Sequence, residues 1–253
     1  MQALTGLDET VYCLAFAERH QKNRLTSIPG DRVVEAARNN AAEIRRALEG
    51  IRPDVVINLA GAGIKPDERT AVNLSNGNRR LTINLLKGCV DDPPKRFIQA
   101  GSWSEYDAGA DRRPIAEDHP LTTKPGYGAA KSAAIKEGLS VASQLDIPFV
   151  ALRLFNVYGP GEASSRLIPF IIDHLSRYMD VPLTMGDQVR DFIFIDDVVS
   201  AFIEAARSDN LMPDSVYNIC TGCPTSVRQV AEGVAKALKR PTDLLRFGDL
   251  PSR

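Results

Sequence analysis

Short apolar runs alternate with helical patterns along most of this chain. The clearest runs are VYCLAF (11–16), DVVINLAG (54–61), RFIQAG (96–101) and FVALRLF (149–155). Apolar residues at consecutive positions are typical of strands buried on both faces, as in a parallel sheet covered by helices. Strands are also predicted at 192–195 and 216–219, and helices near 40–49, 68–90, 127–145, 165–178, 196–208 and 226–239. This alternation predicts an α/β protein with a doubly wound parallel sheet.

The character of the chain changes near residue 156. Beyond this point the predicted strands shorten and the loops carry more Pro and Gly. We therefore predict a main domain over 1–155 and a smaller lobe over 156–253. The strand near 216–219 is expected to return to the main sheet.

Charge and hydropathy exclude several classes of protein. The 253 residues include 31 Lys and Arg against 32 Asp and Glu, so no basic excess favours a nucleic-acid partner. No apolar run approaches the roughly 18 residues of a membrane helix. The start, MQALTGLDET, lacks the pattern of a signal peptide. The expectation is a cytoplasmic protein without a membrane or nucleic-acid partner.

The four cysteines do not predict a metal site. Cys220 and Cys223 form a single Cys-x-x-Cys, whereas a zinc site needs further ligands and none is close in sequence. We interpret the two as small residues at the end of a strand, with a redox dithiol as the alternative.

The segment PGYGAAKSAA carries the strongest local signal for chemistry. Tyr127 and Lys131 stand four residues apart, which places them on one face of a helix. An ammonium group at that distance favours the phenolate form of a tyrosine, whose pKa is ordinarily about 10. Such a tyrosine can exchange a proton with a hydroxyl or carbonyl. The alternative is an ordinary helix with a core tyrosine and a solvated lysine.

A serine at a strand end supplies the context for this pair. Ser102 directly follows the apolar strand RFIQAG. Ligands of doubly wound folds sit beyond the carboxyl ends of the strands, where a hydroxyl can bond a reacting oxygen. A plain turn serine is the alternative.

From about residue 11 to the end, the chain resembles the extended short-chain dehydrogenases/reductases. Within these it is most similar to the NAD-dependent epimerase/dehydratase family, which acts on nucleotide sugars. The resemblance rests on segments in a fixed order: RPDVVINLAGAG, AVNLSNGNRRL, RFIQAGSWSEYD, PGYGAAK, ALRLFNVYGPGE, RLIPFII, QVRDFIFIDDVV and VYNICTGCPTSVRQVAE. It implies a Rossmann-like dinucleotide-binding domain with a substrate lobe, and NAD or NADP as cofactor.

The resemblance also implies a role for individual residues. Tyr127 would be the acid/base, Lys131 would lower its pKa and hold the nicotinamide ribose, and Ser102 would orient the substrate oxygen. The other residues implied at the cofactor are Leu59, Ala60, Gly61, Asn73 and Leu154. Those implied at a nucleotide-sugar substrate are Trp103, Asn156, Arg166, Arg190 and Arg253. Arginine suits phosphate because its planar fork binds two oxygens. For Arg190 the alternative is an ion pair with Asp191 or Asp196.

Both ends of the chain depart from the family pattern. The glycine-rich turn that lets backbone approach a pyrophosphate is missing: LTG at 4–6 only echoes its start, and Glu9 and Tyr12 stand where glycines are wanted. The first strand is missing with it, and FGDLPSR resembles the approach to an absent final segment. We expect a truncated frame rather than a decayed cofactor half, and weak or no binding of NAD(P) by the chain as given.

The segment after Ser102 bears on the reaction. Dehydratases of the family carry Asp-Glu there, whereas this chain has Trp103 and Ser104. Reduction of a 4-keto sugar is the favoured prediction, and 4-epimerisation is the alternative. A non-catalytic sensor or an inactive fragment is the alternative of another class. Small residues at Ala129, Ala130, Ala133 and Ala134, on a helix that forms dimers in this family, predict a homodimer. The sequence specifies neither the sugar nor the nucleotide.

Overall fold

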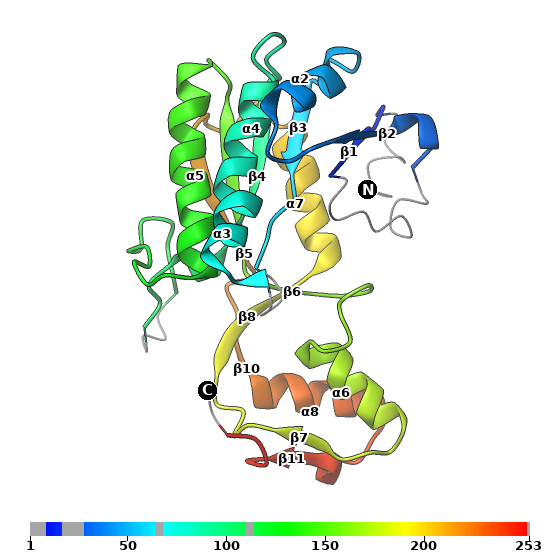
Figure 1. Cartoon of the computed structure of the whole chain (residues 1–253). Helices are drawn as coiled ribbons and strands as arrows, with labels where there is room; N and C mark the ends of the chain where they lie inside the picture. The colour runs from blue at the N-terminus through cyan, green and yellow to red at the C-terminus, as the bar shows by residue number, and fades with distance from the viewer. Residues whose placement is uncertain (1–8, 17–27, 64–67, 110–113, 252–253) are drawn as a thin grey trace. The chain divides into compact units, whose positions relative to one another are not determined.

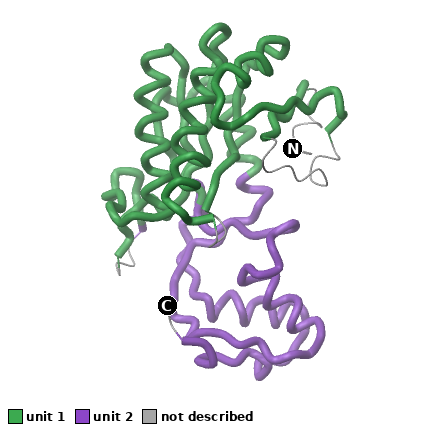
Figure 2. The backbone as a smooth tube through the Cα atoms, in the orientation of Figure 1, with its two compact units in different colours: residues 1–111, 115–154, 199–218 green, residues 112–114, 155–198, 219–253 purple. Residues whose placement is uncertain are grey.

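In a computed structural model, the chain divides into two units, each with its own hydrophobic core. The structure describes residues 9–16, 28–63, 68–109 and 114–251. Unit 1 comprises residues 1–111, 115–154 and 199–218, and unit 2 comprises 112–114, 155–198 and 219–253 (Figure 2). The sequence pattern predicts one boundary near residue 155, whereas in the structure residues 199–218 belong to the first unit.

Unit 1 contains a four-stranded sheet in the order β3-β4-β5-β9 (Figure 1). Its strands are β3 (Val55–Asn58), β4 (Arg96–Ser102), β5 (Phe149–Leu154) and β9 (Ser215–Ile219). β4 pairs in parallel with β3 on one side and with β5 on the other. β1 (Cys13–Phe16) and β2 (Val33–Ala36) form a second, separate parallel pair. The α/β class with a parallel sheet is thus confirmed, and β9 lies in the main sheet.

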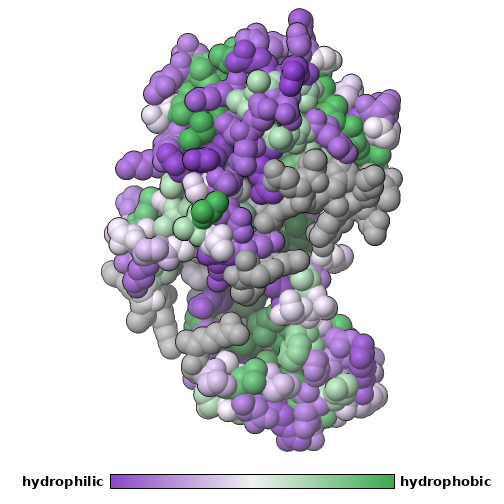
Figure 3. Space-filling model, in the orientation of Figure 1, coloured by the Kyte–Doolittle hydropathy of each residue, from purple (hydrophilic) through white to green (hydrophobic). Residues whose placement is uncertain are grey.

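Helices cover the main sheet and enclose its core. They are α2 (Ala41–Glu49), α3 (Ala71–Leu74), the π-helical segment η5 (Ser75–Arg80), α4 (Leu81–Gly88), α5 (Tyr127–Gln144) and α7 (Ile195–Arg207). Ile44, Leu86, Phe97 and Phe149 are fully buried in this core, and the two phenyl rings stack with centroids 5.4 Å apart. On the face shown in Figure 3, hydrophilic side chains are spread over the outer surface of unit 1, as expected for helices with one apolar face.

Unit 2 is built from short strands and two helices. β6 (Asn156–Tyr158), β8 (Val189–Phe194) and β10 (Pro224–Ser226) form one sheet, and β7 (Val181–Leu183) pairs with β11 (Leu245–Phe247). α6 (Leu167–Ser176) and α8 (Val227–Ala237) pack on the second pair, and a short turn of 3-10 helix, η7 (Thr242–Leu244), precedes β11. None of the helices in the described ranges is long and apolar enough to cross a membrane.

The start of α5 is fixed by a close approach to the loop after β4. That loop forms η6 (Trp103–Glu105), a single turn of 3-10 helix. A Cβ atom at Gly128, the second residue of α5, would lie 1.8 Å from the Ser104 carbonyl oxygen. Only glycine therefore permits this contact, which sets Tyr127 beside the end of β4.

We predict that Gly128→Ala destabilises unit 1, because its methyl group can fit only if α5 moves away from η6. Overpacking of this kind costs about 1–3 kcal/mol, so the unfolding midpoint in urea should fall. Gly50→Ala is the matched control, because no atom lies within 4 Å of its Cβ position and its φ is −83°. It should stabilise the chain by about 0.4–1 kcal/mol. Equal midpoints for the two variants would contradict the close contact.

Candidate functional site

The end of β4 is locked by a reciprocal pair of hydrogen bonds. The Ser102 backbone N–H donates to Glu105 Oε1 at 2.7 Å, and the Ser104 N–H donates to Ser102 Oγ at 3.3 Å. The Ser102 and Ser104 hydroxyl oxygens lie 2.9 Å apart. This capping box gives the half-buried Ser102 hydroxyl a defined position at the carboxyl end of the strand.

A buried ion pair between Arg153 and Glu105 stabilises this turn. The Arg153 Nε donates to Glu105 Oε2 at 2.9 Å, and both residues are almost completely buried. Arg153 Nη1 also donates to the Tyr106 hydroxyl at 2.8 Å. Burial raises the pKa of the Glu105 carboxyl, and the charge of Arg153 acts against that rise. Gly101 makes room for the carboxylate, since a methyl group there would lie 2.7 Å from Oε1.

Lys131 lies within the protein rather than in solvent. Its side chain is 4% exposed, and Nζ donates to the Ala100 carbonyl at 2.5 Å. Burial lowers the pKa of Lys131 to about 8, although the nearby Glu105 carboxylate raises it. The ammonium group is thus held at the end of β4, two residues before Ser102.

Tyr127 is the first residue of α5, one helical turn from Lys131. It is half-buried and lies against the loop after β3, because a methyl group at Gly63 would approach its Cδ2 atom to 3.0 Å. A methyl group at Gly61, in the same loop, would lie 3.7 Å from Lys131 Nζ. The predicted pair Tyr127 and Lys131 and the predicted Gly61 therefore meet at one edge of the sheet.

The remaining predicted cofactor residues of unit 1 occupy neighbouring strand ends. Leu154 stands opposite Ser102 in the β4–β5 register. Leu59 follows β3 with 62% of its surface exposed, and Ala60 packs against the core. Trp103, predicted at the substrate, is the half-buried first residue of η6.

The structure draws attention to Asn78 rather than to the predicted Asn73. Asn73 is exposed on α3, whereas Asn78 is 2% exposed within η5. Asn78 Nδ2 donates to the carbonyls of Ala62 (3.0 Å) and Leu74 (2.9 Å), which ties the helix to the loop after β3. The sequence holds a signal for this. Positions 74, 78, 81 and 85 follow the helical repeat, with leucine at every position except 78.

The predicted phosphate-binding residues belong to unit 2. Asn156, in β6, donates from Nδ2 to the Asp191 carbonyl at 3.1 Å. Arg166 precedes α6 and pairs with Glu162 at 3.3 Å. Arg190 is half-buried in β8 and donates to the Val189 carbonyl at 2.7 Å. Arg253 and the LTG segment at 4–6 lie outside the described residues. The described residues contain no cluster of His, Cys, Asp and Glu suited to a metal ion.

Known proteins with similar sequences modify nucleotide sugars. A CDP-abequose synthase of Salmonella typhimurium is 42% identical over 89 residues, which are 34% of this chain and 30% of that protein. A probable UDP-glucuronate 4-epimerase of Rhizobium meliloti is 29% identical over 236 residues, covering 84% of this chain and 68% of that protein. The chain thus spans less than two thirds of some relatives, such as the 62% matched in a Yersinia pseudotuberculosis CDP-abequose synthase.

The fold and the family agree. The crystal structure of dTDP-glucose 4,6-dehydratase from Bacillus anthracis, in complex with NAD, superposes with a TM-score of 0.82 at 19% identity, covering 97% of this chain and 78% of that one. The model of the NAD dependent epimerase/dehydratase family matches residues 2–220. Over most of its length, this chain belongs to the NAD-dependent epimerase/dehydratase family.

Proposed function

We propose that this chain is an NAD(P)-dependent oxidoreductase that reduces a 4-keto group on a nucleotide-linked sugar. The observation that carries the proposal is the buried Lys131 ammonium, held by the Ala100 carbonyl one helical turn from Tyr127. Burying a cation costs free energy, so a buried lysine at a strand end indicates a functional role. The spacing of one helical turn between Lys131 and Tyr127 supports stabilisation of the Tyr127 phenolate as this role.

The loop after β3 fits the nicotinamide end of such a cofactor. Gly61 and Gly63 present backbone rather than side chains next to Lys131 and Tyr127. Backbone without Cβ atoms permits close approach of a ligand at the carboxyl ends of the strands. Lys131 and Tyr127 would hold the ribose. The NAD complexes of structural relatives support this choice, although this sequence lacks a glycine-rich turn for the pyrophosphate.

The chemistry then follows from the positions of three side chains. When bound, the reduced nicotinamide supplies the hydride that adds to the sugar C4 carbon. Tyr127 donates its phenolic proton to the C4 oxygen, so the carbonyl becomes a hydroxyl and the phenolate is left. The Ser102 hydroxyl holds the same oxygen, and the Lys131 ammonium stabilises the phenolate.

The residues after Ser102 favour reduction over dehydration. Loss of a sugar hydroxyl requires an acid to protonate the leaving group, and Trp103 and Ser104 supply none. Similarity to CDP-abequose synthases over 89 residues at 42% identity supports a deoxysugar substrate. The alternative is 4-epimerisation, supported by the longer match to a probable UDP-glucuronate 4-epimerase. In unit 2, Asn156, Arg166 and Arg190, together with Arg253, are proposed to bind the nucleotide diphosphate.

The decisive experiment incubates the 253-residue chain with NADH or NADPH and a panel of CDP-, UDP- and dTDP-linked 4-keto sugars. A reductase oxidises the cofactor in proportion to product, as measured at 340 nm. In a parallel incubation with NAD+, an epimerase would instead interconvert UDP-glucuronate or UDP-glucose and its C4 epimer with no net formation of NADH. If no nucleotide sugar is converted and calorimetry detects no binding of NADH or NADPH, the hypothesis of a non-catalytic sensor or an inactive fragment gains support.

For the active chain, we predict that Tyr127→Phe lowers kcat by about 10²–10⁴-fold, the usual contribution of a general acid. KM should change little, because the ring that contacts Gly63 is retained. Tyr178→Phe is the matched control, since Tyr178 lies on unit 2 with 65% of its surface exposed. Near-full turnover by Tyr127→Phe in steady-state kinetics would exclude it as the acid.

The buried Lys131 predicts a specific pH dependence. Its pKa of about 8 in the folded chain lies below that of an unfolded lysine, roughly 10.4. Between these values the unfolded chain binds more protons, so the contribution of Lys131 to the free energy of unfolding rises with pH. Urea titrations of the native chain and of Lys131→Met should therefore show a stability difference that shifts in favour of the native chain from pH 7.5 to 10. A constant difference would contradict the lowered pKa. Activity should fall over the same range as the ammonium is lost.

We also propose that the chain forms a homodimer through the helices α4 and α5. Ala129, Ala130 and Ala133 are half-buried small residues on α5, which permits close approach of a second helix. Light scattering at tens of micromolar should give twice the monomer mass of 27.6 kDa. A monomeric mass would count against the dimer, and it would leave the proposed chemistry untouched.

A further inference from the structure

Two of the four cysteines lie close together in the sequence of unit 2, in a turn that the proposed chemistry does not use. Cys220 directly follows β9 and Cys223 directly precedes β10, so the pair flanks the connection between these strands. Both residues are exposed. Cysteine is otherwise among the residue types that are most often buried. Packing at the end of a strand therefore does not account for this pair.

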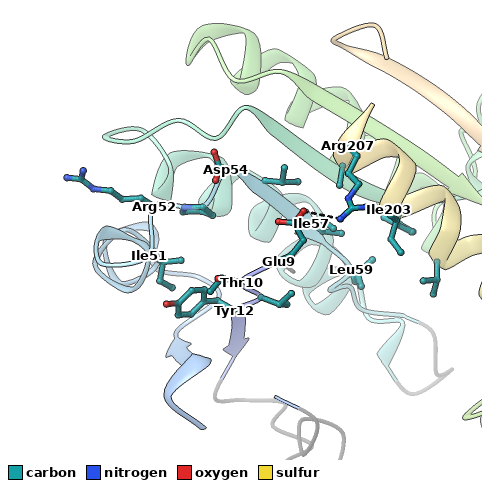
Figure 4. A pocket seen from close by; sticks show the side chains of 16 residues that line it. Glu9, Thr10, Tyr12, Ile51, Arg52, Asp54, Ile57, Leu59, Ile203 and Arg207 are labelled. Carbon is teal, nitrogen blue, oxygen red and sulfur yellow. Dashed lines mark hydrogen bonds and ion pairs between the residues drawn. The ribbon is translucent and has the colours of Figure 1, made fainter. Parts of the chain in front are cut away.

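The other two cysteines are protected by their surroundings. Cys89 lies in the core of unit 1, where burial raises the pKa of its thiol to about 12. Cys13 is half-buried, and burial raises the pKa of its thiol as well. It directly follows Tyr12, which lines a mainly apolar cavity of about 500 Å³ beside β3 (Figure 4). Because the thiolate is the reactive form of cysteine, Cys13 and Cys89 serve as internal controls of low reactivity.

The Asp191 carboxylate holds the turn between the two exposed cysteines. Its Oδ1 accepts the Thr221 N–H at 2.9 Å and the Thr221 hydroxyl at 3.0 Å, and its Oδ2 accepts the Gly222 N–H at 2.7 Å. Consecutive N–H groups that converge on one anion form a concave stretch of backbone. Gly222 has a φ of 75°, a left-handed conformation that glycine adopts without strain. The residues between the cysteines thus curve around a single carboxylate.

The residue after the pair is anchored at the same position of β8. Pro224 stands opposite Asp191 in the antiparallel register of β8 and β10. The middle of the segment from Cys220 to Cys223 and the residue that follows it are therefore both held at Asp191. This curved and anchored backbone favours the short Cα separation, about 4.4–6.8 Å, that a disulfide requires.

We propose that Cys220 and Cys223 form a dithiol site that exchanges reversibly with small disulfides of the glutathione class. The thiolate of one cysteine attacks a sulfur of the small disulfide, which releases one small thiol and leaves a mixed disulfide. The thiolate of the other cysteine then attacks the protein sulfur of that mixed disulfide, which forms the Cys220–Cys223 bond and releases the second small thiol. The two protein thiols lose two electrons and two protons, and the small disulfide gains both.

The test equilibrates the whole 253-residue chain with mixtures of reduced and oxidised glutathione. Acid stops the exchange, and the unfolded chain is labelled with N-ethylmaleimide and digested with trypsin. Residues 208–228 form one tryptic peptide that contains both Cys220 and Cys223. Mass spectrometry should show that this peptide loses two hydrogens and takes up no label as the share of oxidised glutathione rises. Excess reduced glutathione should reverse the change, and the peptides that contain Cys13 and Cys89 should stay labelled throughout.

Two substitutions test how the site works. Cys223→Ser removes the second thiol, so Cys220 should stop at the mixed disulfide and carry one glutathione. Asp191→Asn keeps the size of the side chain but replaces one accepting oxygen with a donor. It should lower the equilibrium constant for closing the disulfide roughly tenfold, because the turn loses a charged acceptor. Asp187→Asn, at an exposed position four residues earlier, is the matched control and should leave this constant unchanged.

Four results would overturn the proposal. They are an unchanged peptide 208–228 at every glutathione ratio, glutathione on both cysteines without closure, a disulfide between two chains on a non-reducing gel, and equal constants for Asp191→Asn and the native chain. The glutathione titration uses the unaltered chain, so it decides even if Asp191→Asn fails to fold. None of these results depends on the proposed reductase activity.

Discussion

The arrangement of unit 1 depends most on the contacts that the buried Glu105 carboxylate makes with Ser102 and Arg153. It is fully buried, accepts the Ser102 N–H with one oxygen and pairs with Arg153 through the other. Through Arg153 and Tyr106 the network reaches Asn218 on β9, whose Oδ1 accepts the Tyr106 hydroxyl at 2.6 Å. Three neighbouring strands are thus joined by one polar chain. Because a buried carboxylate without partners is costly, every member of the network is needed to keep the others in place.

Most of the sheet of unit 1 could be predicted from the sequence. Runs such as RFIQAG and FVALRLF are mostly apolar, which predicts strands buried on both faces, although each run also contains one buried polar residue, Gln99 or Arg153. β2 was not predicted, because Val33–Ala36 is a four-residue strand with the charged Glu35 in it. In unit 2 the predicted strand at 192–195 overlaps β8, whereas β6, β7, β10 and β11 were not predicted because each has only three residues. The predicted helix over 68–90 is one continuous helical stretch. Residues 75–80 within it form a π-helical segment, which the hydrophobic periodicity of the sequence does not predict.

The parts of the candidate site that could be predicted are those whose positions follow from sequence spacing within one helix or strand. Tyr127 and Lys131 stand one helical turn apart, and Ser102 ends a strand, so their placement follows from secondary structure. Glu105 was missed, because a single acidic residue in a turn resembles a solvated one until its partner Arg153, 48 residues later, is known. Asn78 was missed because resemblance drew attention to Asn73, although the leucine repeat around position 78 indicated burial. Long-range partners of this kind are not encoded in local pattern.

The glycines around the site have a consequence for how this protein can change. Methyl groups at Gly77 and Gly101 would lie 2.3 Å from Ala62 Cβ and 2.7 Å from Glu105 Oε1. At these two positions any side chain larger than that of glycine would collide with Ala62 or with the buried Glu105 carboxylate. Substrate specificity therefore cannot change through gradual substitution at Gly77 and Gly101. Specificity is instead expected to change at half-buried positions such as Trp103 and Leu154, whose side chains already border the site.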